Sequence, residues 1–199
     1  LVADEVICGY GRTGQWFGAD YFGFTPDIMT TAKGLTSGYI PMGAVLFNDR
    51  IANVLRDQGG ELAHGYTYSG HPVCAAVALE NIRILQDEKI LETCREVTGP
   101  YLAGRWQALG EHPLVGEARI AGMVGALELV PDKPARRFFE ERGKVGTLCR
   151  TMALKNGLIL RATNDSMLLS PPLTISRLEI DELFDKTWKS LNETAEAIA

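Results

Sequence analysis

The chain has 199 residues, of which 46% are hydrophobic and 23% are charged, and its formal net charge is -5. This composition is typical of a folded globular protein and argues against a disordered chain. The acidic balance and the scattered Lys and Arg residues offer no basic patch, so nucleic acid and membrane surfaces are not expected as partners.

Four cysteines lie far apart in the sequence and form no CxxC pair. We therefore predict reduced, buried thiols in a cytoplasmic protein. No apolar run approaches the roughly 20 residues of a membrane span, and residues 1–8 do not show the basic segment followed by an apolar one that is typical of a signal peptide. The chain starts inside an apolar run without an initiator Met, so we expect further sequence before Leu1. His64 and His71 lack metal-ligand spacing, and no metal site is predicted.

Two carboxylates interrupt the first apolar segment of the chain. Residues 1–8 are otherwise apolar and stop at Gly9, which predicts a strand buried on both faces. Asp4 and Glu5 are neighbours, and neighbouring strand residues point to opposite faces, so at least one faces the interior. A buried carboxylate requires a cation or hydrogen-bond donors. Either a structural ion pair with an arginine elsewhere or a functional site would meet that need.

The run Gly9-Tyr10-Gly11-Arg12-Thr13-Gly14 matches the G-x-G-x-x-G spacing of dinucleotide-binding loops. Such a loop needs a helix that begins at its third glycine. Residues 15–18 and the aromatic residues after them predict a loop instead. We interpret the run as a glycine-rich turn.

Further strands are predicted over residues 26–32 and 43–47, joined by the turn-rich residues 34–41, and they suggest a mostly parallel sheet. Lys33 follows the first of these strands, at the carboxyl end, where open α/β sheets bind ligands. It is either a solvated strand-end lysine or an amine nucleophile toward aldehydes. An amine and a carboxylate on neighbouring strands are what a pyridine-aldehyde cofactor needs.

The remaining sequence predicts an α+β arrangement. Helices are expected over residues 72–85, 89–109 and 145–155, and strands over 123–130, 158–162 and 167–170. Pro72 suits a first helical position. A last helix is predicted from the Ser176-x-x-Glu179 capping box and the apolar face that follows it. We expect a sheet-rich part over residues 1–85 and an α+β part over residues 86–199.

Seven sequence blocks together resemble the class III aminotransferases, the ω-aminotransferase group. They keep the order and spacing of that family over the whole chain, and they are residues 4–6, 9–14, 26–28, 32–34, 38–45, 64–72 and 170–173. The resemblance implies an α/β, fold-type I pyridoxal-phosphate-dependent transferase. Residues 1–85 would be part of a large cofactor-binding domain with a mostly parallel sheet. Residues 86–199 would form a linking helix and a small α+β C-terminal domain.

The resemblance also implies roles for individual residues. Lys33 would hold pyridoxal 5'-phosphate as a Schiff base and move the substrate proton. Asp4 would pair with the pyridinium nitrogen, and Val6 would pack on the ring as well as in the core. Thr67 would reach the cofactor phosphate of a neighbouring subunit, which implies a homodimer with shared active sites. Without the resemblance, Thr67 is better explained as a capping hydroxyl ahead of Pro72.

The C-terminal blocks bear on the substrate. Relatives that act on α-amino acids such as ornithine carry an arginine where this chain has Leu168, whereas amine:pyruvate members carry a mobile arginine at the position of Arg161. The resemblance therefore implies that Arg161 binds the carboxylate of a keto acid. A surface role for Arg161 as an ordinary strand residue stays open.

The implied function is transfer of an amino group from a primary amine, diamine or ω-amino acid to pyruvate or a similar keto acid. Another class III branch, such as a 4-aminobutyrate-type aminotransferase or an aminomutase, is an alternative, and so is 2-oxoglutarate as the acceptor. The family's phosphate-binding turn and cofactor-stacking ring lie upstream of Leu1. The chain could therefore also be a non-catalytic fragment that serves in packing or dimerisation.

Overall fold

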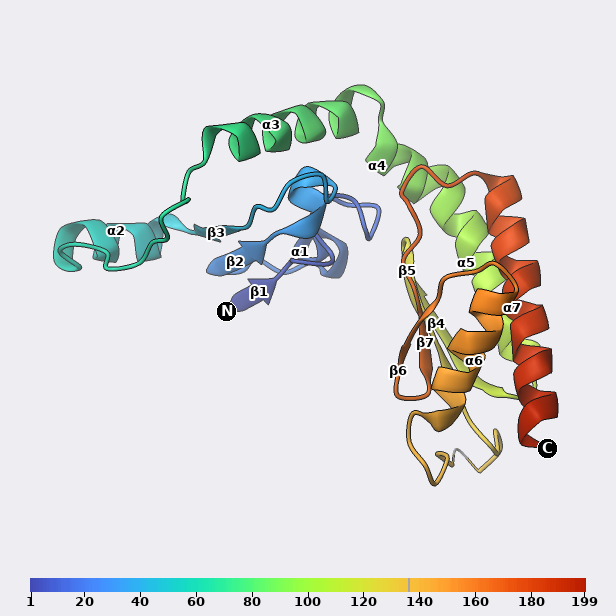
Figure 1. Cartoon of the computed structure of the whole chain (residues 1–199). Coiled ribbons are helices and arrows are strands. Elements are labelled where there is room, and N and C mark those ends of the chain that lie inside the picture. The colour runs from blue at the N-terminus through green and yellow to red at the C-terminus, as the bar shows by residue number, and fades with distance from the viewer. Residues whose placement is uncertain (136) are drawn as a thin grey trace. The chain divides into compact units, whose positions relative to one another are not determined.

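A computed structural model of the protein describes residues 1–135 and 137–199 (Figure 1). They form two compact units, Leu1–Thr93 and Cys94–Ala199, here called unit 1 and unit 2. Within the described residues, no helix has both the length and the apolar character needed to cross a membrane.

Unit 1 consists of short strands followed by helices. In chain order its elements are β1 (Val2–Asp4), α1 (Gly18–Phe22), β2 (Ile28–Thr31), the 3-10 turn η1 (Lys33–Thr36), β3 (Ala44–Phe47), α2 (Asp49–Gln58), α3 (Pro72–Asp87) and α4 (Ile90–Thr93). The strands form one sheet in the order β1-β2-β3. The predicted strands over residues 26–32 and 43–47 are confirmed in shortened form.

The sheet of unit 1 is mixed, which corrects the expectation of a mostly parallel sheet for this part of the chain. β1 and β2 are parallel, whereas β2 and β3 are antiparallel. A parallel return needs a crossover connection that usually contains an α-helix. Residues 32–43 contain only η1 and turns, so the chain reverses direction between β2 and β3.

The first strand is also shorter and less covered than predicted. It ends at Asp4, and residues 6–13 form turns. β1 pairs with β2 on one side, and Val2 remains 62% exposed while Ala3 is buried. The strand is therefore buried on one face only in this chain.

Two helices of unit 1 were not predicted. α1 occupies residues that were interpreted as loop, but it begins four residues after Gly14, so the rejection of a dinucleotide-binding loop holds. α2 begins after Asn48, whose side chain accepts a hydrogen bond from the Ile51 amide. That cap and the spacing of Ile51, Val54 and Leu55 were available signs of a helix.

Unit 2 places helices on one face of a four-stranded antiparallel sheet. Its elements are the π-helical turn η2 (Cys94–Thr98), α5 (Gly99–Ala108), η3 (Leu109–Glu111), β4 (Val115–Ala121), β5 (Val124–Leu129), α6 (Lys144–Lys155), β6 (Arg161–Thr163), β7 (Ser166–Leu169) and α7 (Arg177–Ile198). The strand order is β4-β5-β7-β6. All but β4 overlap predicted elements, and the helix expected over residues 89–109 is divided by η2.

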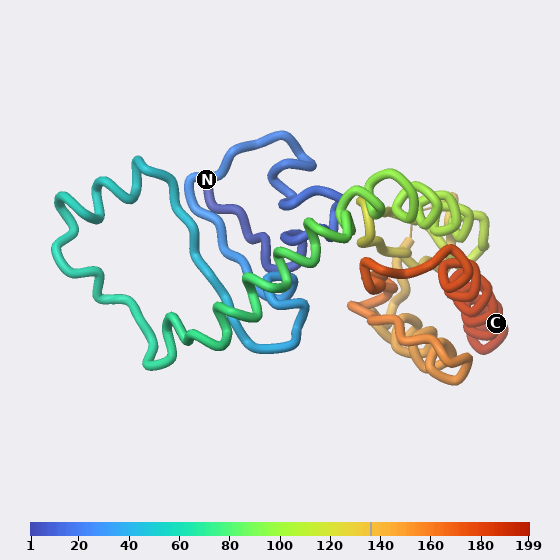
Figure 2. Tube along the Cα trace, turned by 90° about the horizontal axis from the view of Figure 1, so that it is seen from above, coloured from blue at the N-terminus to red at the C-terminus, as the bar shows by residue number. Residues whose placement is uncertain are grey.

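The core of unit 2 lies between this sheet and its helices. α7 packs between α5 and α6 (Figures 1 and 2). The predicted Ser176–Glu179 capping box is present, and Ile180, Leu183, Thr187 and Leu191 of α7 are buried. Leu127 and Met167 of the sheet are fully buried beneath these helices.

Candidate active site

Asp4 and Lys33 lie at the same edge of the sheet of unit 1. Asp4 is the last residue of β1 and is in register with Thr30 of β2. Lys33 follows the end of β2 by two residues and begins η1. Because β1 and β2 are parallel, their carboxyl ends meet at one edge, which is where ligands bind in open α/β sheets. The structure thus brings together a carboxylate and an amine that lie 29 residues apart in the sequence.

Local hydrogen bonds hold the Asp4 carboxylate. Its Oδ1 atom accepts from the Val6 amide at 3.1 Å and from the Thr30 hydroxyl at 3.4 Å. Val6 is half-buried in the turn that follows β1, while Asp4 is exposed in this chain. The carboxylate therefore has a fixed orientation but keeps acceptor capacity for a further donor.

Glu5, not Asp4, is the buried carboxylate of the pair. It is 2% exposed, and its two oxygens accept from the backbone amides of Gly18 at 2.8 Å and Ala19 at 2.7 Å. These are unpaired amides at the start of α1, where a negative charge is favoured. Its partners are thus backbone amides, and the arginine ion pair that was considered for this strand is not its explanation.

The thiol of Cys8, near the carboxylates of Glu5 and Asp4, is held in its protonated form. Burial raises the pKa of Cys8, and the nearby carboxylates of Glu5 and Asp4 raise it further, with the Arg12 charge opposing them. The four cysteines are thiols rather than disulfides; Cys94 and Cys149 are buried, as predicted, whereas Cys8 and Cys74 are half-buried.

The turn that carries Lys33 has an unusual backbone. Lys33 adopts a φ of 41°, in the left-handed region that non-glycine residues enter at a cost. A Cβ atom on the next residue, Gly34, would lie 2.9 Å from the Gly9 carbonyl oxygen and 3.1 Å from the Tyr10 Cβ. The glycine-rich run 9–14 therefore packs directly against the Lys33 turn. Sequence reasoning identified this run as a turn but missed its contact with Gly34.

Thr67 lies in a non-helical, exposed segment ahead of α3. The alternative role as a capping hydroxyl is wrong, because the N-cap residue of α3 is His71. Pro72 does occupy the first turn of α3, as predicted. Thr67 is thus exposed on the same unit as Asp4 and Lys33.

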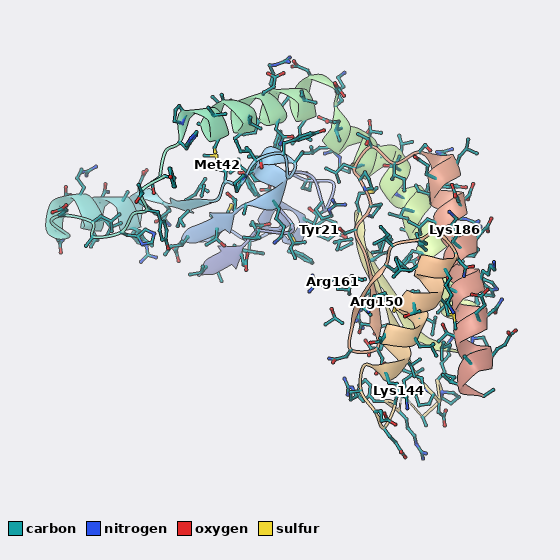
Figure 3. All side chains as sticks on the ribbon, in the orientation of Figure 1. Tyr21, Met42, Lys144, Arg150, Arg161 and Lys186 are labelled. Carbon is teal, nitrogen blue, oxygen red and sulfur yellow. The ribbon has the colours of Figure 1, made fainter. Side chains whose placement is uncertain are left out.

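Arg161 belongs to unit 2 and is exposed at the start of β6. It is in register with Leu168 of β7. Met167 and Leu169 of β7 are buried beneath the helices, so Leu168 points to the opposite face of the sheet. Arg161, its partner in register, lies on that same face (Figure 3). Within residues 1–135 and 137–199, Arg161 has no ion-pair partner.

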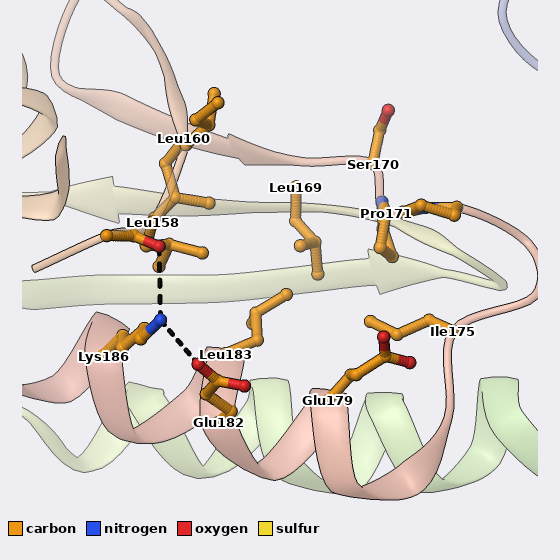
Figure 4. A pocket seen from close by; sticks show the side chains of 13 residues that line it. Leu158, Leu160, Leu169, Ser170, Pro171, Ile175, Glu179, Glu182, Leu183 and Lys186 are labelled. Carbon is orange, nitrogen blue, oxygen red and sulfur yellow. Dashed lines mark hydrogen bonds and ion pairs between the residues drawn. The ribbon is translucent and has the colours of Figure 1, made fainter.

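A cavity of about 340 Å³ lies in unit 2, between α7 and the segments that flank β6 and β7 (Figure 4). Leu158, Leu169 and Leu183 supply apolar walls. Its charged groups are already engaged: Lys186 Nζ lies 2.6 Å from the Glu182 carboxylate and donates to the Gly157 carbonyl at 3.3 Å. We assign this cavity no role in the chemistry of Asp4 and Lys33.

No group of three or more His, Cys, Asp and Glu side chains that could hold a metal ion is found among the residues that the structure describes. The chemical groups at the sheet edge of unit 1 are the Lys33 amine and the Asp4 carboxylate. This set can bind an aldehyde covalently and hold a protonated ring nitrogen by charge and hydrogen bond.

Comparisons with known proteins identify the family of the chain. The model of the family "Aminotransferase class-III" matches residues 1–191. The putrescine–pyruvate aminotransferase of Pseudomonas aeruginosa is 60% identical over 198 residues, which are 100% of this chain and 43% of that protein. The diaminobutyrate–2-oxoglutarate transaminase of Halomonas elongata is 43% identical, again over 100% of this chain and 43% of that protein.

Solved structures give the same result. A thermostable ω-transaminase variant engineered for asymmetric synthesis of enantiopure bulky amines superposes with a TM-score of 0.95 and 39% identity, over 100% of this chain and 44% of that one. The ω-transaminase of Pseudomonas jessenii in complex with PMP superposes with a TM-score of 0.93 and 40% identity, over 98% and 44%. The chain thus spans less than half the length of the relatives that it matches. Its sequence and its fold both show that it belongs to the class III aminotransferases.

Proposed function

We propose that the protein to which this chain belongs is a pyridoxal-phosphate-dependent aminotransferase. It moves an amino group from a primary amine, diamine or ω-amino acid to pyruvate or a similar keto acid. The observation that carries the proposal is the meeting of Asp4 and Lys33 at the carboxyl ends of two paired parallel strands. The membership of the chain in the class III family supports it.

The groups at this edge suit pyridoxal 5'-phosphate. Lys33 would bond the aldehyde carbon, and the fixed Asp4 carboxylate would hold the ring nitrogen in its protonated form. Val6 would pack against the ring from the turn after β1. When bound, the cofactor supplies a protonated ring that takes up the electron pair of the broken substrate C–H bond. The Lys33 amine, once released from the cofactor, would carry the proton between the two reacting carbons.

Arg161 is proposed to bind the carboxylate of the acceptor. Its guanidinium is exposed and has no ion-pair partner among the described residues, so it is available for two charge-assisted hydrogen bonds. It sits across from Leu168, the position at which α-amino-acid relatives carry their arginine. The two arginine positions are therefore adjacent on one sheet face. An arginine at position 161 and an arginine at position 168 would present their guanidinium groups from neighbouring points on this face.

The names of the relatives favour a diamine as donor and pyruvate as acceptor. The P. aeruginosa relative at 60% identity is named for putrescine and pyruvate. The H. elongata relative at 43% identity is named for diaminobutyrate and 2-oxoglutarate. We therefore place pyruvate first and keep 2-oxoglutarate as the alternative acceptor.

The active site is proposed to be shared between two subunits of a homodimer. Tyr66 and Tyr68, which flank Thr67, are 78% and 81% exposed in this chain. Such aromatic exposure is typical of a surface that another chain covers, and Thr67 would reach the cofactor phosphate of the neighbouring subunit. We assign residues 1–85 to the large domain and residues 86–199 to the linking helix and small domain. Cysteines that remain thiols favour the cytoplasm.

A panel of amines offered to the full-length protein with either pyruvate or 2-oxoglutarate tests this function. We expect the highest kcat/KM for a diamine with pyruvate, and formation of alanine in equal amount to the amine consumed. Preference for 2-oxoglutarate would move the protein to another class III branch. If no amine in the panel transfers its amino group to either keto acid, the proposal is contradicted. The remaining alternative would be a non-catalytic module.

A further inference from the structure

One side chain of α3 makes several hydrogen bonds to the turn that carries Lys33. The Asn81 Nδ2 atom donates to the Gly34 carbonyl at 2.9 Å and to the Leu35 carbonyl at 3.1 Å. Its Oδ1 atom accepts from the Ser37 hydroxyl at 2.6 Å. Both ends of one amide thus bind the turn of η1 and Ser37, which lies 44 to 47 residues away in the sequence.

These bonds meet a need of the turn itself. The end of a helix leaves carbonyls without partners inside the helix. Asn81 binds the Leu35 carbonyl and adds a second bond to the Gly34 carbonyl, which also accepts from the Ser37 amide at 3.3 Å. The turn also holds two non-glycine residues in the left-handed region, Lys33 with φ 41° and Ser37 with φ 49°. Such conformations persist when the surroundings fix them from several sides.

The opposite side of the turn is fixed by a close approach. Gly34 packs against the Gly9 carbonyl and the Tyr10 Cβ so closely that a side chain at position 34 would collide with them. Tyr10 is itself buried, and its hydroxyl lies 3.4 Å from that of Thr31, at the end of β2. The Lys33 turn is therefore held between the glycine-rich run and Asn81.

We infer that Asn81 is a positioning residue that sets the direction from which the Lys33 amine approaches its electrophile. It touches neither the cofactor nor the substrate in this assignment, and it acts through the backbone of Lys33 to Ser37. The inference rests on the proposed function, because it takes Lys33 as the residue that bonds the cofactor. Asn81 is neutral, so its effect is geometric and leaves the charge of the site unchanged.

The test follows the covalent step at Lys33 rather than turnover. Full-length protein freed of cofactor is mixed with pyridoxal 5'-phosphate and quenched with borohydride at increasing times. The Lys33 amine attacks the aldehyde carbon, and the aldehyde oxygen leaves as water with the two amine protons. Borohydride then delivers hydride to the carbon of the C=N bond and solvent delivers a proton to its nitrogen, which gives a stable secondary amine. Peptide mass mapping measures the fraction of Lys33 that is modified at each time.

Two substitutions remove the hydrogen bonds of Asn81 in different ways. Asn81→Ala deletes all three bonds. Asn81→Asp keeps the acceptor for Ser37 but places oxygen against the Gly34 and Leu35 carbonyls. We expect both to slow modification of Lys33 about 10- to 100-fold at saturating cofactor, which is typical of a misplaced reacting group. For Asn81→Ala, which adds no charge, the pH dependence of the rate should keep its midpoint, and in both variants the amides of residues 33–38 should exchange hydrogen faster.

Arg83→Ala is the matched control. Arg83 lies on the same helix, is exposed, and pairs with Glu80 and Asp87 instead of the turn. Wild-type rates in both Asn81 variants, or equal slowing in the Arg83 variant, would overturn the role of Asn81. If one Asn81 variant fails to fold, the other decides. If the wild-type protein itself carries no modification on Lys33, the proposed function fails instead.

Discussion

Asp4 and Glu5 are adjacent in the sequence, yet they meet different surroundings. Strand geometry predicts that one of them faces inward, and the structure assigns this place to Glu5. Sequence alone could not identify the buried one, because its partners are backbone amides of Gly18 and Ala19 and carry no sequence signature. The family resemblance, by contrast, selected Asp4 and Lys33 for chemistry, and the fold brings those two to one sheet edge.

The proposed role of Arg161 in binding the acceptor carboxylate can be tested by removing its side chain. Arg161→Ala should weaken acceptor recognition by about 2 to 4 kcal/mol, because a carboxylate loses two charge-assisted hydrogen bonds. An uncharged amine makes no such bonds. The half-reaction from the amine should therefore stay nearly intact, while the return half-reaction with pyruvate slows strongly. Stopped-flow absorbance can follow each half-reaction separately.

Arg150→Ala is a suitable comparison, since Arg150 is exposed on α6 of the same unit (Figure 3). It should leave both half-reactions unchanged. Equal losses in both half-reactions of the Arg161 variant would indicate a structural residue, and no loss in either would assign the carboxylate to another group.

His112 should make unit 2 sensitive to acid. Burial lowers its pKa below 6.5, the nearby Lys133 charge also lowers it, and the hydrogen bond with Asn192 opposes them. Its Nδ1 atom accepts from the Leu114 amide, which fixes a neutral ring with the proton on Nε2 toward Asn192. Because the unfolded state binds the proton more readily, this contribution to stability is present above pH 6.5 and is lost as the pH falls from there through the lowered pKa.

Urea unfolding of the full-length protein at several pH values measures this effect. Unit 2 should lose stability as the pH falls below 6.5, and His112→Gln, which cannot take up a proton there, should lose less over the same fall in pH. Identical pH dependence in the wild-type protein and the variant would contradict the assignment.

The capping box at the start of α7 is expected to stabilise this helix. The Ser176 hydroxyl accepts from the Glu179 amide, and the Glu179 carboxylate accepts from the Ser176 amide. The Ser176 amide and the Ser176 hydroxyl both donate to the Glu179 carboxylate, and these two bonds lower the pKa of Glu179. Ser176→Ala should destabilise the helix by about 1 kcal/mol. Hydrogen exchange in the first turn of α7 measures the loss, and Ser176→Thr, which retains a hydroxyl, should restore most of it.

Helices with capping residues or a proline at their start were predicted correctly, whereas two features of the sheets were missed. The capping box of α7 and the proline at the start of α3 mark their helices within a few residues. The antiparallel pairing of β2 with β3 was missed but was also predictable, because the predicted turn-rich connection is too short for the helical crossover that a parallel pairing needs. β4 was missed although Glu117 and Arg119 alternate with less polar residues, a pattern that suits a strand with one open face.

The support of the Lys33 turn, by contrast, could not be predicted from its own segment of sequence. Sequence reasoning placed Lys33 after a strand, but the support from Asn81 comes from a helix more than 40 residues away. An asparagine in an amphipathic helix is ordinarily a surface residue, so no local pattern distinguishes it. Its role is visible only when α3 packs on η1.

Unit 1 leaves large apolar side chains uncovered. Tyr39 is 88% exposed and Leu79 is 69% exposed, and β1 offers an unpaired edge beside exposed Val2. Exposed apolar surface and open strand edges favour association with other chains. Since the relatives are more than twice as long as this chain, we expect the remainder of the protein and a second subunit to cover them.

Residues 1–199 produced alone should therefore associate or precipitate and should not transfer an amino group from a diamine to pyruvate. Sedimentation and an assay for alanine test both statements, with the full-length protein as the positive control. A monomeric chain of this length that turns over a diamine with pyruvate would contradict the prediction.

Lys33 is proposed as the residue that bonds the cofactor. Borohydride reduction of the full-length enzyme as purified with its cofactor, followed by peptide mass mapping, tests this assignment. We expect one modified lysine, Lys33, and loss of both the modification and amino transfer in Lys33→Ala. A modification on any other lysine, or a Lys33→Ala protein that still transfers amino groups, would contradict it.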